Sequence, residues 1–204
     1  GDGLVFVSDS SRARILVLDA GGQVQRAFGS TAELGRPTGI CWDPRGQRLL
    51  VIDTTGCRLL AFDALGHCLQ QVGERGDLPG QFNYPTNLAL AADGRVFVVD
   101  SLNFRVQILD AALRPVSTFG SVGRGPGSFA NPKGVAIDSD GQVYVVDSMF
   151  DNVQIFAASG QLLLPFGSHG SLLGELQLPS GICIDGEDRI FVADGGNARV
   201  HIFR

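Results

Sequence analysis

The stretch "RVFVVDSLNFRVQIL", residues 95–109, decides the fold of this chain. An apolar run ends at Asp100, a four-residue turn follows, and a second run alternates apolar and polar side chains. Short runs rich in Val, Ile and Phe favour β-strands, and two such runs around a tight turn predict a β-hairpin. No part of the sequence has the 3.6-residue apolar period of an amphipathic helix.

The same hairpin recurs along the whole sequence. The aspartates that end the first run are separated by 44, 47, 47 and 47 residues. They are Asp9, Asp53, Asp100, Asp147 and Asp194. A proline before each repeat and a glycine at its end recur with nearly the same period. A repeat of about 47 residues is typical of one blade of a β-propeller.

The third repeat contains four strand signals, at residues 86–91, 95–100, 105–110 and 115–120. The first is small and apolar, which suits the innermost strand of a blade. The second is almost continuously apolar, as expected for a strand buried on both faces. The third alternates, which suits a half-exposed strand. Four consecutive strands joined by short turns predict an antiparallel sheet.

We therefore expect an all-β fold, a β-propeller of four-stranded antiparallel blades. Five blades are visible, three of them complete and two partial. The predicted blades form a single domain over residues 1–204 and cover residues 1–30, 37–73, 85–120, 132–167 and 179–204.

The repeat resembles a known family. The segments "VVDSLNFRVQIL" and "FGSVGRGPGSFANPKGVAID", residues 98–109 and 119–138, are similar to the NHL repeat. The resemblance covers essentially the whole chain, with the best copies at residues 83–120 and 131–167. It implies a six-bladed propeller of bacterial type. The missing strands are then expected in a longer chain, where strands from both termini complete one blade.

Composition excludes several classes of protein. The 204 residues are 44% hydrophobic and 18% charged, which is typical of a globular chain. The net charge of −5, with 16 basic against 21 acidic residues, argues against a nucleic-acid surface. No apolar run approaches the roughly 20 residues of a membrane span.

The four cysteines do not form a CxxC motif, so the sequence does not support a zinc cluster. Cys41 and Cys183 occupy equivalent positions of two repeats, where we expect small buried side chains. Cys57 and Cys68 fall near opposite ends of a predicted hairpin, too far apart for a disulfide. All four are predicted to be free thiols.

The repeated aspartate is best interpreted as structural. In four repeats an arginine follows it by five residues, where the next strand begins. The pairs are Asp9 with Arg14, Asp53 with Arg58, Asp100 with Arg105, and Asp194 with Arg199. An aspartate at a strand end can accept backbone N–H groups of the turn and an arginine hydrogen bond. We predict a repeated hairpin clasp and no catalytic carboxylate.

No motif for catalysis or for a cofactor is present. The sequence has no GxSxG nucleophile motif, and its three histidines lie at unrelated positions of their repeats. The polar residues that enter the inner strands, among them Asn87 and Lys133, do not make a set of ligands for a hard cation. The glycine-rich residues 120–129 lack a phosphate-loop ending and are expected to connect two blades, with Phe129 buried. We expect no metal and no cofactor.

The turns between the second and third strands should lie on one face with the connections between blades. Two adjacent turns carry apolar side chains. The candidates for binding a partner are Leu102, Phe104, Met149, Phe150 and Asp151. In the fourth repeat Asn152 replaces the clasp arginine, so Asp147 and Asp151 are expected to form an unneutralised acidic pair. Two alternatives stay open: an exposed patch, or side chains folded back over the channel mouth.

We predict a non-enzymatic scaffold that binds a protein partner through this face. The resemblance implies an extracytoplasmic bacterial propeller in the periplasm or outside the cell. It also implies a partner such as a multihaem cytochrome or another envelope protein. The alternative is a propeller hydrolase or lyase whose metal ligands lie on further blades.

Overall fold

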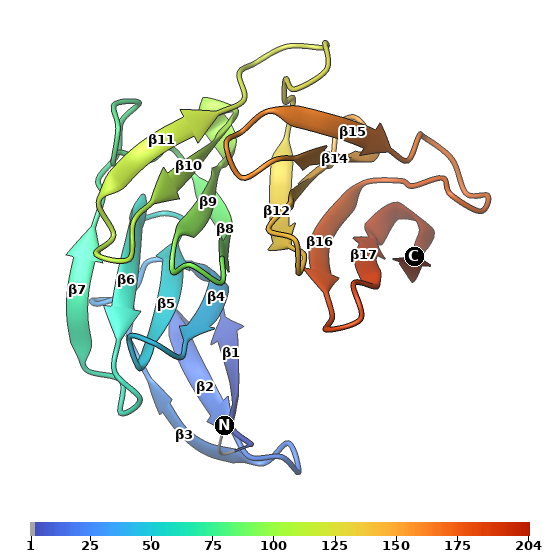
Figure 1. The fold of residues 1–204 in the computed structure, drawn as a ribbon. Coiled ribbons are helices and arrows are strands. Elements are labelled where there is room, and N and C mark those ends of the chain that lie inside the picture. Colours follow the sequence, from blue (N-terminus) through green and yellow to red (C-terminus); the bar gives the residue numbers. More distant parts are fainter. Residues whose placement is uncertain (1–2) are drawn as a thin grey trace. The chain divides into compact units, whose positions relative to one another are not determined.

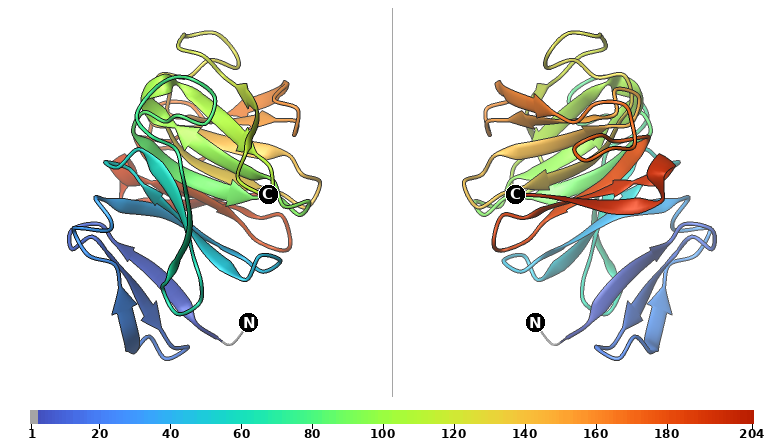
Figure 2. Two further views of the ribbon diagram at one scale, coloured as in Figure 1. Left: turned by 90° about the vertical axis from the view of Figure 1, so that its left-hand side faces the viewer. Right: turned by 90° about the vertical axis from the view of Figure 1, so that its right-hand side faces the viewer.

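In the computed structural model, which describes residues 3–204, consecutive strands pair into five antiparallel sheets (Figure 1). Three of these sheets have four strands and two have three. In each sheet the spatial order of the strands follows the sequence, as in a meander. The strands of a sheet are twisted relative to one another, as the side views show (Figure 2). Each sheet is therefore one propeller blade.

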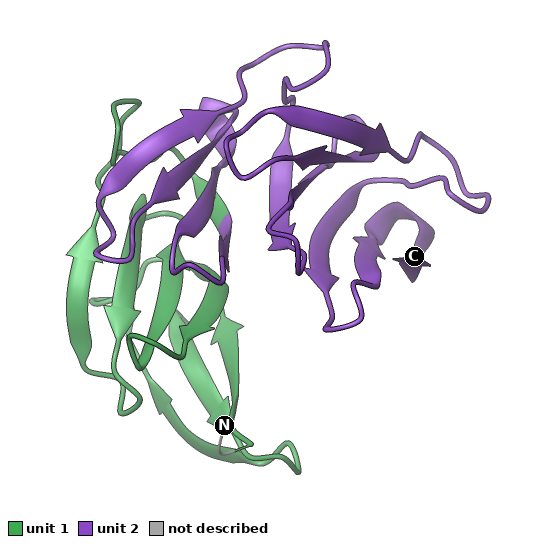
Figure 3. Ribbon diagram, viewed as in Figure 1, with its two compact units in different colours: residues 1–86 green, residues 87–204 purple. Residues whose placement is uncertain are grey.

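The chain divides into two compact units, residues 1–86 and 87–204, which are described separately (Figure 3). The first unit holds two blades. Blade 1 consists of β1 (Val5–Asp9), β2 (Arg14–Leu18) and β3 (Val24–Phe28). Blade 2 consists of β4 (Pro37–Asp43), β5 (Arg48–Asp53), β6 (Arg58–Phe62) and β7 (Cys68–Val72). Their core includes Ile15, Val51 and Phe62.

The second unit holds nearly all of blade 3 and the whole of blades 4 and 5. Blade 3 consists of β8 (Pro85–Leu90), β9 (Val96–Asp100), β10 (Arg105–Leu109) and β11 (Pro115–Phe119). Blade 4 consists of β12 (Pro132–Ile137), β13 (Val143–Asp147), β14 (Asn152–Phe156) and β15 (Leu162–Phe166). Blade 5 consists of β16 (Pro179–Ile184), β17 (Ile190–Asp194) and β18 (Arg199–Phe203). Two 3₁₀ turns, η1 (Ser101–Asn103) and η2 (Gly195–Asn197), join second to third strands.

The strands of blade 3 begin and end within one residue of the predicted bounds. Every residue of β9 and of β13 is buried, as the continuous apolar runs predicted. Both faces of β13 enter cores of the second unit, with Val143 and Val145 in one cluster and Tyr144 and Val146 in another. Phe97 and Val99 of β9 belong to the same cluster as Phe129 and Phe156. The period of the sequence therefore predicts the local structure well.

The two three-stranded blades differ from the complete ones in burial. Val200 and Ile202 on β18 are 63% and 56% exposed, whereas Val153 and Ile155 at the same positions of β14 are buried. On β1, Val5 is 51% exposed. Apolar side chains at these positions are thus covered in a complete blade and open in a three-stranded one.

The prediction that Cys183 is buried is wrong. Its side chain is exposed, and that of Cys41 is only partly buried. Ala136, at the same position of blade 4, is buried because β12 packs against β9 and against β16. No later sheet of the described residues follows β16 to cover Cys183 in the same way. All four cysteines are free thiols, as predicted.

A glycine after the last strand of each of blades 1 to 4 lies against the side chain that holds the following connection in place. These glycines are Gly29, Gly73, Gly120 and Gly167, all with φ between 87° and 94°. The side chains, here called the anchors, are Leu34, Phe82, Phe129 and Leu176, all fully buried. A Cβ added to any of these glycines would overlap its anchor. The glycine is therefore required by both its backbone angle and the space available.

We predict that Gly120→Ala destabilises the fold by about 2–4 kcal/mol, because a methyl group would overlap the Phe129 ring at a positive φ. The matched control is Gly141→Ala, where φ is +80° and a Cβ would meet no atom within 4 Å. That control should cost about 1 kcal/mol, the backbone contribution alone. Urea unfolding of both variants measures the difference, and equal losses would contradict the packing argument.

Candidate partner-binding face

An ion pair joins two neighbouring strands in four of the five blades: β1 and β2 in blade 1, and the second and third strands in blades 2, 3 and 5. The Nε of each arginine lies close to Oδ2 of the aspartate five residues earlier, and we call this pair the clasp. The distances are 3.0 Å for Arg14 and Asp9, 3.0 Å for Arg58 and Asp53, 2.8 Å for Arg105 and Asp100, and 2.8 Å for Arg199 and Asp194. The two residues of each pair are direct neighbours in the antiparallel register, which explains why a spacing of five residues brings them together.

The clasp aspartate also accepts backbone hydrogen bonds from two other segments. The carboxylate of Asp53 accepts N–H groups of Gly35 and Arg36 in the preceding connection, at 3.0 and 2.8 Å. It accepts a further N–H from Gly56 in the turn, at 3.1 Å. Burial alone would raise the pKa of Asp53, but these N–H groups and the Arg58 guanidinium outweigh it and lower the pKa. One carboxylate thus fixes strand, turn and connection together.

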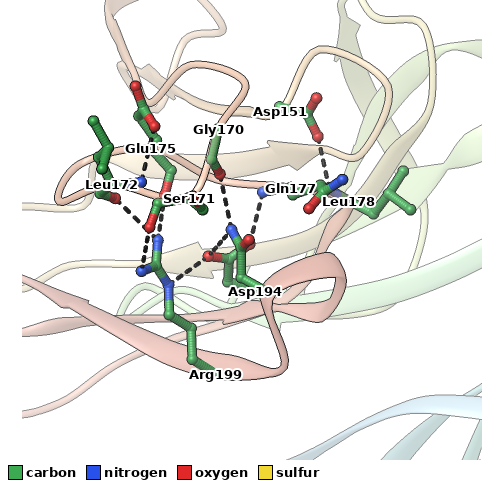
Figure 4. Close-up of polar contacts among 10 residues, drawn as sticks. Asp151, Gly170, Ser171, Leu172, Glu175, Gln177, Leu178, Asp194 and Arg199 are labelled. Atoms are coloured by element: carbon green, nitrogen blue, oxygen red, sulfur yellow. Dashed lines mark hydrogen bonds and ion pairs between the residues drawn. The ribbon is translucent and has the colours of Figure 1, made fainter.

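The guanidinium end of the clasp arginine is held by the same connection. In blade 5, Arg199 donates hydrogen bonds to the carbonyl oxygens of Ser171, Leu172 and Glu175, at 2.9, 3.1 and 2.8 Å (Figure 4). In blade 2, Arg58 donates to the carbonyl of Glu33 at 2.7 Å. The arginine therefore neutralises a buried carboxylate and satisfies carbonyl groups of the connection at once.

Blade 4 lacks this arginine. Its carboxylate, Asp147, is fully buried and accepts four backbone N–H groups. They belong to Ala130, Asn131, Met149 and Phe150, at 2.7 to 3.2 Å. Within residues 3–204 no cationic side chain forms an ion pair with Asp147. Asn152, which replaces the arginine, has a buried Oδ1 without a hydrogen-bond partner.

The structure corrects the predicted acidic pair. Asp151 is buried, and its backbone has a φ of 52°. Its Oδ1 accepts the N–H of Leu178 at 2.7 Å, and its Oδ2 lies 2.7 Å from Nδ1 of His169. Its carboxylate is therefore bound by the next connection and does not stand open beside Asp147. The sequence could not reveal this because both contacts are to residues at least 18 positions away.

The apolar side chains of the turns divide into two groups. Leu102 and Met149 are 50% and 65% exposed at the tips of their turns. Phe104 is partly buried and packs on the core of its unit. Phe150 is also partly buried, and it lines a pocket described below. Two of these side chains are therefore exposed and two are partly buried.

Three exposed leucines that sequence reasoning missed lie on the connection from blade 4 to blade 5. Leu172, Leu173 and Leu178 are 70%, 94% and 58% exposed. The contacts of Asp151 with His169 and Leu178 tie this connection to the turn that carries Met149. The sequence did contain a signal for these exposed leucines. The connection after blade 4 reads "SLLG" at residues 171–174, whereas the equivalent residues after blade 3 read "RGPG". We call Met149, Leu172, Leu173 and Leu178 the Met149 patch.

The structure offers no evident place for metal chemistry within residues 3–204. No group of three or more His, Cys, Asp or Glu side chains is arranged there to hold a metal ion. The histidines have separate environments: His67 contacts Asp63, His169 contacts Asp151, and His201 stacks on Phe203. Over the same residues, no helix is long and apolar enough to cross a membrane.

Comparison with solved structures identifies the class of protein. The chain aligns with virginiamycin B lyase from Staphylococcus aureus at a TM-score of 0.73 and 16% identity, covering 100% of this chain and 67% of that one. It aligns with the gluconolactonase XC5397 from Xanthomonas campestris at a TM-score of 0.73 and 19% identity, covering 98% and 71%. At these identities the likeness shows the fold alone. With five successive antiparallel blades, the chain is a β-propeller.

Sequence comparison then identifies the type of repeat. The NHL repeat matches residues 129–156 and 176–203, each from an anchor to the third strand of the next blade. Human E3 ubiquitin-protein ligase NHLRC1 is 33% identical over 69 residues, which cover 34% of this chain and 18% of that relative. The chain therefore spans less than a fifth of this curated relative. The chain therefore contains NHL repeats, arranged as blades of a β-propeller. Because the proteins it resembles include a lyase, a lactonase and a ligase, this likeness assigns no reaction.

Acidification is predicted to weaken the clasps. The pKa of Asp53 and that of Asp194 lie below the ordinary value of 3.8. A carboxylate with a lowered folded-state pKa stabilises the fold above its unfolded-state pKa, and this contribution is lost as the pH falls through the folded-state pKa. The free energy of unfolding in urea should therefore decline below about pH 4. Asp53→Asn should make that decline shallower, and an unchanged pH dependence in this variant would contradict the assignment.

Proposed function

We propose that this chain is a non-enzymatic scaffold that binds a protein partner through the face formed by its strand 2–3 turns and inter-blade connections. The observation that carries the proposal is the Met149 patch, four exposed apolar side chains on a turn and a connection that are hydrogen-bonded to each other. Leu102 adds a fifth on the neighbouring turn.

The physical case rests on exposure combined with rigidity. Apolar side chains exposed on neighbouring loops are unfavourable in water and gain free energy when a partner covers them. The clasps and Asp151 fix the backbone that presents them, so little conformational entropy is lost when a partner binds. Met and Leu side chains can then fill pockets of a partner as the dry centre of an interface. A buried and internally bonded Asp151 acts here as a support for the face and not as a contact residue.

We further propose that the propeller has six blades and that additional strands cover its three-stranded blades. The exposure of Val5, Val200 and Ile202 supports this, because the equivalent positions are buried in complete blades. A bacterial origin, a periplasmic or extracellular location, and an envelope partner such as a multihaem cytochrome rest on the resemblance of the repeats to extracytoplasmic propellers. Native mass spectrometry of the protein from its source would identify its length and any stable partner.

The second candidate function is a metal-dependent hydrolase or lyase. It is favoured by the likeness in fold to a lyase and a lactonase. In that case ligands outside the described residues would complete a site. Metal analysis of the full-length protein tests this alternative. A stoichiometric Ca or Zn, whose removal abolishes turnover of lactones or esters, would overturn the scaffold proposal.

The double substitution of Leu102→Ser and Met149→Ser should weaken partner binding at least tenfold, because two exposed apolar contacts are worth roughly 1 kcal/mol or more each. Affinity is measured by biolayer interferometry against the partner recovered by cross-linking and mass spectrometry from the native source. The matched control is Val116→Ser, which removes a 59% exposed side chain from the outer strand β11. An unchanged affinity in the double variant, or an equal loss in the control, would contradict the proposed face.

A further inference from the structure

Blade 4 contains a pocket of about 310 Å³ in front of its incomplete clasp. The residues that line it are Arg124, Gly125, Pro126, Phe150, Asn152, Gln154 and Pro165. Phe150 belongs to the strand 2–3 turn, Asn152 begins β14, and residues 124–126 belong to the connection. The pocket therefore lies between the same two segments that the clasp arginine joins in the sister blades.

Blade 5 shows what normally occupies this space. Asn152 corresponds to Arg199, and Arg124 and Gly125 correspond to Ser171 and Leu172. In blade 5 the guanidinium of Arg199 fills the equivalent position and donates to the carbonyls of Ser171, Leu172 and Glu175 while its Nε binds Asp194 (Figure 4). The pocket of blade 4 is thus the place of a missing guanidinium.

The acceptors for that guanidinium are still present in blade 4. Asp147 keeps its buried negative charge without an ion-pair partner within residues 3–204, and Asn152 keeps a buried Oδ1 without a donor. Of the three equivalent carbonyls, only that of Ser128 is taken over by a side chain, the Nε2 of Gln154 at 2.8 Å. The carbonyl of Gly125 accepts one N–H at 3.0 Å, as Leu172 does at 3.2 Å in blade 5 while also binding Arg199.

We propose that this pocket binds the arginine side chain of the protein partner. The inference rests on the proposed function and names the chemistry of its central contact. A planar guanidinium fits separated carbonyl and carboxamide acceptors better than a compact ammonium does, because it donates in several fixed directions. The Phe150 ring on the pocket wall adds a surface on which a guanidinium can stack.

The surroundings define the partner segment further. The pocket opens beside the turn that carries Met149, which is 65% exposed. A segment that inserts an arginine therefore brings its neighbouring residues close to the turn that carries Met149. We infer a partner motif in which an arginine is flanked by apolar residues. The net charge of −5 favours the approach of such a cationic segment.

The principal alternative is that Arg124 of the same chain occupies the pocket, because its exposed side chain is among those that line it. If this guanidinium folds inward, the chain satisfies its acceptors by itself. The variant Arg124→Ala separates the two cases. A pocket open to a partner binds external arginine in the wild type and in Arg124→Ala alike, whereas a pocket closed by Arg124 binds it only in the variant, which would overturn the proposal.

The direct test is an NMR titration of the protein with N-acetyl-arginine amide. Saturable shifts are expected for the Asn152 side-chain amide and the Phe150 backbone amide, with a Kd of about 1–10 mM, since a single side chain binds weakly. N-acetyl-citrulline amide has nearly the same shape without the charge and should bind at least tenfold more weakly. Absence of saturation at about 50 mM, or equal binding of citrulline, would overturn the proposal.

The variant Asn152→Arg supplies the missing guanidinium from within and should abolish binding of N-acetyl-arginine amide. It is expected to fold, because the other four blades make the same pair. Asn152→Ala serves as the milder second variant and should weaken binding at least threefold. Undiminished binding in both variants would overturn the proposal. The two proposals can fail separately. If the Leu102 and Met149 double variant loses partner affinity but the protein does not bind N-acetyl-arginine amide, this inference is overturned and the scaffold function is still supported.

Discussion

In four of the five blades, a buried carboxylate at the end of the second strand is the constraint on which the rest of the blade depends. A charge taken out of water costs several kcal/mol unless strong hydrogen bonds surround it. The fold meets this requirement by bringing a turn, a neighbouring strand and the preceding connection to the same two oxygens, as around Asp53. The turn and the preceding connection are thereby held to the strand end by hydrogen bonds.

Features that are local in sequence could be predicted from it. The strands of blade 3 follow from apolar runs and tight turns, because each hairpin is closed by residues close together in the chain. The clasp spacing follows from the same geometry, since Asp53 and Arg58 are opposite each other in the register. The five turns also share a left-handed residue after this aspartate, at Ala13, Cys57, Phe104, Asp151 and Ala198. No glycine pattern marks that position, so the sequence did not disclose it.

Features that depend on contacts between blades could not be predicted. The sequence suggests that the carboxylate of Asp151 is unpaired. Its hydrogen-bond partners in fact come from the connection that follows the fourth strand. Cys183 has the same place in its repeat as the buried Ala136, and its exposure depends on whether another sheet follows. Leu172 and Leu173 stand out only when the connection is seen beside the Met149 turn. In a repeat protein, the period describes the inside of a unit and says little about its neighbours.

In blade 4, Asn152 stands at the position of the clasp arginine, and a pocket lies there at a modest cost in stability. Removing one partner of a buried ion pair usually destabilises a fold by about 3–5 kcal/mol. Asp147 retains four backbone donors, so most of the stabilisation of its charge remains after the change to Asn152. What is left over is a partly satisfied set of acceptors at the surface, shaped by the sister blades for a guanidinium. Blade 4 keeps its fold but leaves these hydrogen-bond acceptors unsatisfied. A partner that supplies a guanidinium there gains more binding free energy than it would at a blade with a complete clasp.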